Sequence, residues 1–226
     1  MLANPNDRLP KILYALTLVT GLVDAVSFLG LGHVFTANMT GNVVFMAFAA
    51  AGAPGLSFFR SSLALLAFAA GAVWGGRLAL TAAQGDGSRW PAQPFALEAA
   101  FLAAAAVASI GMGQPENPIF SDLVIVLTGA AMGIRNATVR KLAVPDMTTT
   151  VLTLTVTGIA ADSSLAGGAN PRWRVRSAAV LLMFVGAGAG ALLVRMPLVV
   201  ALTACAAISA ACAMAARRPA HTEAAA

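Results

Sequence analysis

The sequence predicts an all-α integral membrane protein, a helical bundle of about six spans with two shorter, interrupted helices. Hydrophobic residues make up 59% of the 226 residues and charged residues 10%, whereas about a quarter of the residues in soluble domains are charged. The Lys and Arg residues also lie at the ends of apolar stretches that match the roughly 20 residues of a membrane-spanning helix. This composition excludes a soluble enzyme or a soluble binding module. The net charge of +5 marks the ends of spans and does not indicate a nucleic-acid surface.

Six apolar runs are long enough to cross the hydrocarbon core. The first follows Arg8 and Lys11 and superficially resembles a signal peptide, but it is too long and no small-residue cleavage pattern closes it. We therefore expect it to be the first span. The six predicted spans are Leu9–Leu31, Ser61–Ala82, Phe95–Met112, Ile119–Arg140, Val175–Val194 and Pro197–Ala216.

Two further apolar segments, Met39–Ala51 and Met147–Ala161, are too short to cross the membrane as ordinary helices. A polar, helix-interrupting stretch precedes each of them, residues 36–38 in one case and residues 144–146 in the other. The two segments are either short tilted spans or re-entrant segments. The distribution of charge favours re-entry.

If both short segments cross, the 14 Lys and Arg residues divide almost evenly between the two sides. If both are re-entrant, only Arg60 and Arg195 lie outside and all the others lie on the cytoplasmic side. The second distribution is the one that the positive-inside rule predicts. We therefore expect six spans in the cell (inner) membrane, with both termini cytoplasmic.

The two halves of the sequence, 1–112 and 113–226, resemble each other. GLVDA at 21–25 matches GIRNA at 133–137, and ANMTGNVV at 37–44 matches PDMTTTVL at 145–152. Each half then continues with a span that carries Gly-x-x-x-Gly, a spacing that lets helix backbones approach closely. Because each half contains three crossings, the second must enter the membrane from the opposite side. Inverted repeats with interrupted helices are typical of transporters whose site lies near the membrane midplane.

Asp24 lies about two thirds along the first span, where an ionisable side chain needs a protein-lined or wet cavity. It is either a site that responds to cations or protons, or a structural residue bonded to hydroxyls or a helix terminus. Asn136 occupies the equivalent place in the second half. It is either part of the site or an interhelical hydrogen-bond partner.

Polar side chains also open both short segments, and they complete the predicted solute- or ion-binding set. As N-caps they would satisfy the first N–H groups of each helix. Alternatively, two half-helix N-termini face a shared solute from opposite sides, which we prefer. The predicted site residues are Asp24, Asn38, Thr40, Asn42, Asn136, Asp146, Thr148 and Thr149.

Arg135 and Glu98 are expected near the membrane surface, Arg135 as a marker of the cytoplasmic end of its span and Glu98 at the interface. The alternatives are that Arg135 pairs with Asp24 or Asp146, or that it holds an anion. The two cysteines, Cys205 and Cys212, are spaced too far apart on one helix for a disulfide and are expected to pack. No nucleophile–base pair, metal cluster or phosphate loop is present in the sequence, so we expect no catalytic residue, metal or cofactor.

The strings GLVDAVSFLGLGHVFTANMTGN (21–42) and GIRNATVRKLAVPDMTTTVLTLTVTGI (133–159) resemble the signature of the YoaK-like family. This is a family of bacterial multi-pass membrane proteins, classed as a domain of unknown function. The resemblance spans nearly the whole chain and implies a cytoplasmic-membrane protein with about six spans. It implies no substrate, and no functional residue is carried over from it.

The sequence thus predicts a transporter or channel for a small polar solute or ion, with its site between the two repeats. The alternative is a membrane scaffold, an assembly partner or an intramembrane enzyme that uses Asp24. The expected partners are the lipid bilayer and the solute, without nucleic acid, and the sequence leaves homo-oligomerisation open.

Overall fold

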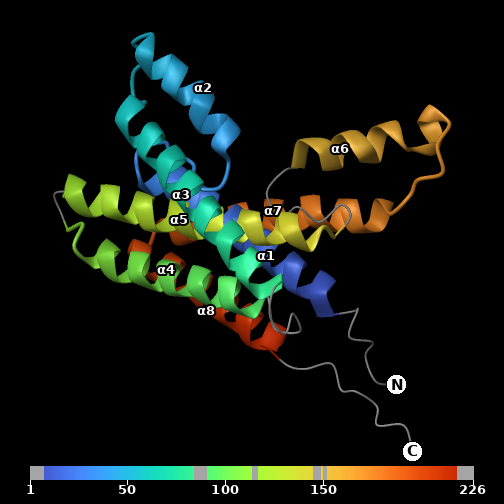
Figure 1. Cartoon of the computed structure of the whole chain (residues 1–226). Coiled ribbons are helices and arrows are strands. Elements are labelled where there is room, and N and C mark those ends of the chain that lie inside the picture. The colour runs from blue at the N-terminus through green and yellow to red at the C-terminus, as the bar shows by residue number, and fades with distance from the viewer. Residues whose placement is uncertain (1–7, 84–90, 114–116, 145–148, 150–151, 218–226) are drawn as a thin grey trace, which may run out of the picture.

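A computed structural model describes residues 8–83, 91–113, 117–144, 149 and 152–217, and this part of the chain folds into α-helices joined by short connections (Figure 1). Six of these helices are long and apolar enough to cross a membrane, which confirms the predicted six-span helical bundle. The six are α1 (Arg8–Gly30), α3 (Phe58–Ala83), α4 (Ala92–Ile110), α5 (Pro118–Leu142), α7 (Trp173–Leu193) and α8 (Leu198–Arg217).

Two shorter helices, α2 (Met39–Ala50) and α6 (Leu152–Ala161), correspond to the predicted interrupted segments. A 3-10 turn, η3 (Ser164–Ala166), follows α6. The start of the second segment was expected at Met147, which lies outside the described residues. The helix ends follow local chemistry. For example, α3 begins three residues earlier than predicted because the Ser57 hydroxyl accepts the Arg60 N–H at 3.2 Å and caps the first turn.

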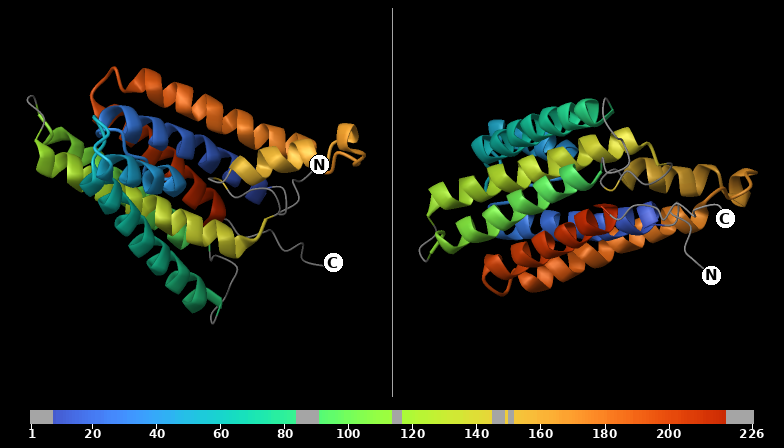
Figure 2. Two further views of the ribbon diagram at one scale, coloured as in Figure 1. Left: turned by 90° about the horizontal axis from the view of Figure 1, so that it is seen from above. Right: turned by 60° about the horizontal axis from the view of Figure 1, so that its bottom comes forward.

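Helices α1, α4, α5 and α8 form the inner layer of the bundle, and α1 and α5 are its most buried members. Helix α3 packs on α5, while α7 packs on α1, so that α3 and α7 lie on the outside (Figures 1 and 2). The start of α1 and the end of α8 lie at the same end of the bundle, as an even number of crossings requires.

Neither short helix crosses the bundle. Helix α2 packs along α3 and α6 along α7, and each starts beside the middle of the neighbouring span (Figure 2). From there α2 runs to the end of the bundle at which α1 finishes, and α6 runs to the opposite end. The spans that flank α2, α1 and α3, finish and start at one end of the bundle, and those that flank α6, α5 and α7, do so at the other, which is the geometry of re-entrant segments.

Glycine contacts hold the outer spans against the inner ones. A Cβ atom added at Gly71 would overlap the Ala130 carbonyl of α5, and one added at Gly186 would overlap the Leu18 carbonyl of α1. The contacts are reciprocal, because a Cβ at Gly133 or Gly21 would meet the backbone of α3 or α7. The predicted close approach of the Gly-x-x-x-Gly spans is confirmed, and the facing glycines are those shared by the GLVDA and GIRNA strings.

A buried ion pair lies at the centre of the inner layer. Arg135 of α5 and Glu98 of α4 are both fully buried, and the Arg135 guanidinium donates a hydrogen bond to the Glu98 carboxylate. Arg135 also donates to the Leu16 carbonyl at 2.7 Å and to the Thr20 hydroxyl at 2.8 Å, both on α1. The Ser209 hydroxyl of α8 donates to the same carboxylate oxygen at 2.6 Å. One charged pair thus connects all four inner helices.

The expectations for Arg135 and Glu98 were therefore wrong. Both side chains are fully buried inside the bundle, and Arg135 pairs with Glu98 and not with Asp24, while Asp146 lies outside the described residues. Helical geometry explains the difference, because the faces of α4 and α5 that carry these residues point inward. A charge on an inward face is tolerated when a partner neutralises it and further hydrogen bonds satisfy both groups.

Filling the glycine contacts should destabilise the protein. Gly71→Ala and Gly186→Ala each force a methyl group against a backbone carbonyl, and overpacking of this kind costs about 1–3 kcal/mol. Gly76→Ala and Gly188→Ala are matched controls on the same two helices, because no atom lies within 4 Å of a Cβ at either position. Thermal melting in detergent should fall for the first pair only. Equal melting temperatures for all four variants would contradict the contact.

Breaking the buried ion pair on one side should cost more than removing it altogether. Glu98→Leu leaves the Arg135 guanidinium buried without its counter-charge, an effect of about 3–5 kcal/mol. Combining Glu98→Leu with Arg135→Met removes both charges and should restore part of the lost thermal stability. Ser209→Ala, which deletes only one hydrogen bond to the carboxylate, should have a smaller effect than either single charge deletion. If the double variant loses as much stability as the two single variants together, Glu98 and Arg135 are not coupled.

Candidate functional site

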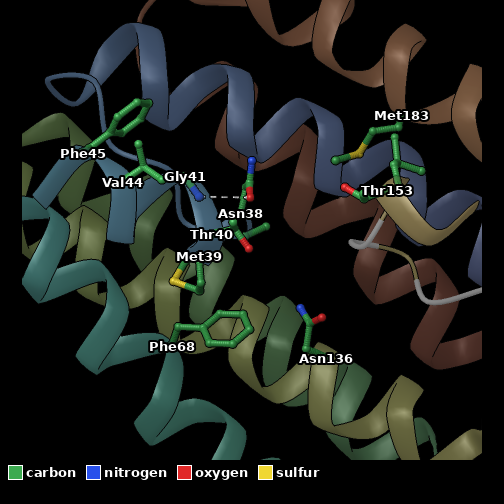
Figure 3. Close-up of a pocket in the computed structure, with 12 residues that line it drawn as sticks. Asn38, Met39, Thr40, Gly41, Val44, Phe45, Phe68, Asn136, Thr153 and Met183 are labelled. Atoms are coloured by element: carbon green, nitrogen blue, oxygen red, sulfur yellow. Dashed lines mark hydrogen bonds between the residues drawn. The ribbon is translucent and has the colours of Figure 1, made fainter. Parts of the chain in front are cut away.

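A pocket of about 560 Å³ lies between the first turns of the two short helices. One wall is the start of α2 and the residues just before it, and the facing wall is the start of α6. Spans α3, α5 and α7 supply the rest through Phe68, Asn136 and Met183 (Figure 3). The remaining lining residues are Ala37, Asn38, Met39, Thr40, Gly41, Val44, Phe45, Leu152 and Thr153.

Among the described residues, the polar side chains that line this pocket are uncharged. Asn38 is the N-cap of α2, and its side-chain oxygen accepts the Gly41 N–H at 3.4 Å (Figure 3). Thr40 in the first turn of α2 and Thr153 in the first turn of α6 present hydroxyl groups from the two walls. Since the first N–H groups of a helix lack partners within the helix, both helices direct partial positive charge towards this space.

Asp24 is close to this pocket but does not line it. Its Oδ1 atom accepts the Ala37 N–H at 2.8 Å, and only 7% of the residue is exposed. The carboxylate therefore binds the backbone of the stretch that leads into α2. This arrangement satisfies backbone groups that would otherwise be unpaired at membrane depth. Asp24 positions the pocket wall and does not itself form that wall.

Asn42 supports the same stretch from the other side and is fully buried. Its side-chain oxygen accepts the Phe35 N–H at 2.9 Å, and its amide donates to the Phe35 carbonyl at 2.5 Å. The Phe35 ring also stacks on those of Phe28 and Phe45, which contact each other as well. Asn42 was predicted to bind solute, but both ends of its side chain are committed to the backbone.

Asn136 lines the pocket from α5, and its side chain points into the space between Thr40 and Thr153 (Figure 3). Its amide donates to the Met132 carbonyl of its own helix at 2.8 Å. Asn136, Asn38 and Thr40 are therefore the predicted site residues that the structure brings together around one cavity.

The remaining predicted residues lie at the entrance to α6. Asp146 and Thr148 fall outside the described residues. Thr149 is buried, with 4% of its surface exposed, and has a left-handed backbone with φ of 59°. Its hydroxyl has no hydrogen-bond partner among the described residues.

Sequence reasoning missed the apolar part of the lining. Phe45, Phe68 and Met183 line the pocket, yet none belongs to the predicted site. A signal was nevertheless present, because Phe68 and Met183 each lie three residues before the first glycine of a Gly-x-x-x-Gly pair. Thr153 was also absent from the predicted set, although it opens α6. No cluster of metal-ligating side chains occurs among the residues with described positions.

Comparison with known proteins agrees with this architecture. Residues 12–215 match the family described as "Protein of unknown function (DUF1275)". The UPF0700 transmembrane protein YoaK of Bacillus subtilis (strain 168) is 33% identical over 156 residues, which cover 68% of this chain and 66% of that relative. No solved structure matches the chain. The expected resemblance to YoaK-like proteins is confirmed, and the chain belongs to the DUF1275 family of multi-pass transmembrane proteins.

Proposed function

We propose that this protein is a transporter or channel that carries a small polar solute or ion through the pocket between α2 and α6. The observation that carries the proposal is the meeting of two short helices that start beside mid-span residues and run to opposite ends of the bundle. A scaffold has no need for such interrupted helices, because irregular backbone at membrane depth is tolerated chiefly where it lines a cavity or is buried in protein.

We further propose that residues 1–112 and 113–226 are inverted repeats with the pocket on the axis that relates them. The helix packing supports this idea, because α1 packs on α7 of the other half as α5 packs on α3. The pocket lining supports it too. Val44 corresponds to Leu152 in the repeat alignment, while Phe68 and Met183 hold equivalent positions before their glycines. A site on such an axis can be exposed by the same motion to either side in turn.

The chemistry of the pocket suits a solute that exchanges its water shell for neutral hydrogen-bonding groups. Asn38, Thr40, Asn136 and Thr153 offer amide and hydroxyl groups, while Phe45, Phe68 and Met183 provide apolar contact. Asp24 acts on this site through the backbone at Ala37.

The proposed orientation has both termini in the cytoplasm and places the protein in the cell membrane. Because Arg135 is buried, it no longer counts as a surface charge. The unequal distribution of the other Lys and Arg residues between the two ends of the bundle remains. Among the described residues, only Arg60 and Arg195 are cations at the end where α1 finishes. The other described cations, apart from Arg135, lie towards the opposite end, which is therefore the proposed cytoplasmic end.

A conducting pocket should be reachable by water. With Cys205 and Cys212 replaced by alanine, Thr40→Cys and Thr153→Cys in vesicles should react with a charged methanethiosulfonate about tenfold faster than lipid-facing positions, because only a hydrated thiol ionises. Val43→Cys and Leu154→Cys are matched controls, since these exposed side chains on the same helices do not line the pocket. Equally slow labelling at all four positions would indicate a dry interface and favour the scaffold alternative.

The proposed orientation predicts which loop can be labelled from outside the cell. A cysteine introduced at Ala53, between α2 and α3, should react with an impermeant maleimide in intact cells, whereas one at Gly167, between α6 and α7, should react only after the membrane is opened. Ala53 is a partly exposed loop residue and Gly167 is an exposed one. Labelling in the reverse pattern would show that the protein has the opposite orientation in the membrane.

A further inference from the structure

A second cavity, of about 650 Å³, lies at the end of the bundle where α1 and α4 finish and α8 starts. It is separate from the pocket between α2 and α6 and shares no lining residue with it. Its floor and walls are largely apolar, formed by Ile110, Met112, Val194, Leu198 and Val199. Arg195 is the charged residue among those that line it.

Arg195 departs from the charge pattern of the rest of the protein. It shares this end of the bundle with Arg60, but the Arg60 guanidinium is bonded to Asp122 at 3.1 Å and to the Leu31 carbonyl at 3.2 Å. Arg195 is exposed and has no ion pair among the residues that the structure describes. A cation at this position therefore has no structural partner within that part of the chain.

The start of α8 adds to the positive character of the cavity. Pro197, Leu198 and Val199 line it, and the first N–H groups of a helix carry partial positive charge. The two features act together, because Arg195 lies only three residues before Leu198. An anionic group held here would meet both a guanidinium and a helix N-terminus.

The surroundings of Arg195 suit hydrocarbon. Ile110 is 67% exposed and Met196 is 56% exposed, and both line the cavity. In water such apolar exposure is unfavourable, whereas at the rim of a membrane bundle an acyl chain covers it. Positive charge beside an apolar groove at the membrane interface is the arrangement that suits an anionic lipid.

We propose that this cavity binds an anionic phospholipid, with its phosphate at Arg195 and the start of α8 and an acyl chain along Ile110 and Met112. The net negative charge of the lipid distinguishes it from a zwitterionic phospholipid, whose amine would lie beside the guanidinium. The lipid holds the ends of α4, α7 and α8 together from outside. This site is independent of the proposed solute pocket.

The test is lipid binding by the purified full-length protein, measured by native mass spectrometry with phosphatidylglycerol and phosphatidylethanolamine of equal chain length. Phosphatidylglycerol should bind more tightly than phosphatidylethanolamine. Arg195→Ala should weaken phosphatidylglycerol binding about fivefold, which is the contribution of one cation near an anionic lipid. Arg195→Lys should retain most of the affinity. Val199→Trp fills the cavity and should weaken the binding of both lipids.

Arg217→Ala is the matched control, because Arg217 is an exposed cation at the other end of the same helix. It should leave phosphatidylglycerol binding at this site unchanged. The proposal is overturned if Arg195→Ala binds phosphatidylglycerol as the unmodified protein does, or if Arg195→Ala and Arg217→Ala weaken it equally. Equal affinity of the unmodified protein for both lipids would likewise exclude recognition of the lipid charge.

Discussion

Inside the bundle the Arg135 guanidinium meets Glu98 on α4 and two acceptors on α1, while Ser209 joins the same carboxylate from α8. In hydrocarbon a charge without these partners would be too costly to bury, so α4 and α5 depend on assembly with each other and with α1 and α8. The rest of the architecture is built outward from this layer. Helices α3 and α7 attach to it through glycine contacts, the short helices attach to α3 and α7, and the solute pocket forms between the short helices.

The residues around the pocket divide into two groups by what their polar atoms bind. Asp24 and Asn42 direct their side chains at the backbone of the stretch before α2 and satisfy groups that no regular helix pairs there. Asn38, Thr40 and Asn136 line the cavity instead. The first group makes an irregular backbone stable at membrane depth, and the second becomes available to a solute as a result. An ionisable residue in a membrane span thus serves the site without contacting what the site binds.

The six spans follow from the length of the apolar runs, and the interrupted helices follow from polar residues ahead of runs that are too short. The glycine contacts were also predictable, because only close backbone approach explains paired glycines in two spans. The Arg135–Glu98 pair was not. Hydropathy places each residue near one end of its run, but only packing decides which face of the helix turns inward. For the same reason Phe68 and Met183 resemble lipid-facing residues in the sequence, and the orientation of the Asp24 carboxylate depends on a backbone turn that no sequence pattern encodes.

The pairing of α1 with α7, and of α3 with α5, also constrains how the protein is made. Membrane helices are synthesised and inserted in order from the N-terminus. The glycine face of α1 therefore has no partner until α7, near the end of the chain, has entered the bilayer. During that interval Gly21 faces lipid or the insertion machinery. Neither half can complete its own packing, so the polypeptide acquires its final structure only late in biosynthesis, and a chain truncated before α7 would leave α1 without its neighbour.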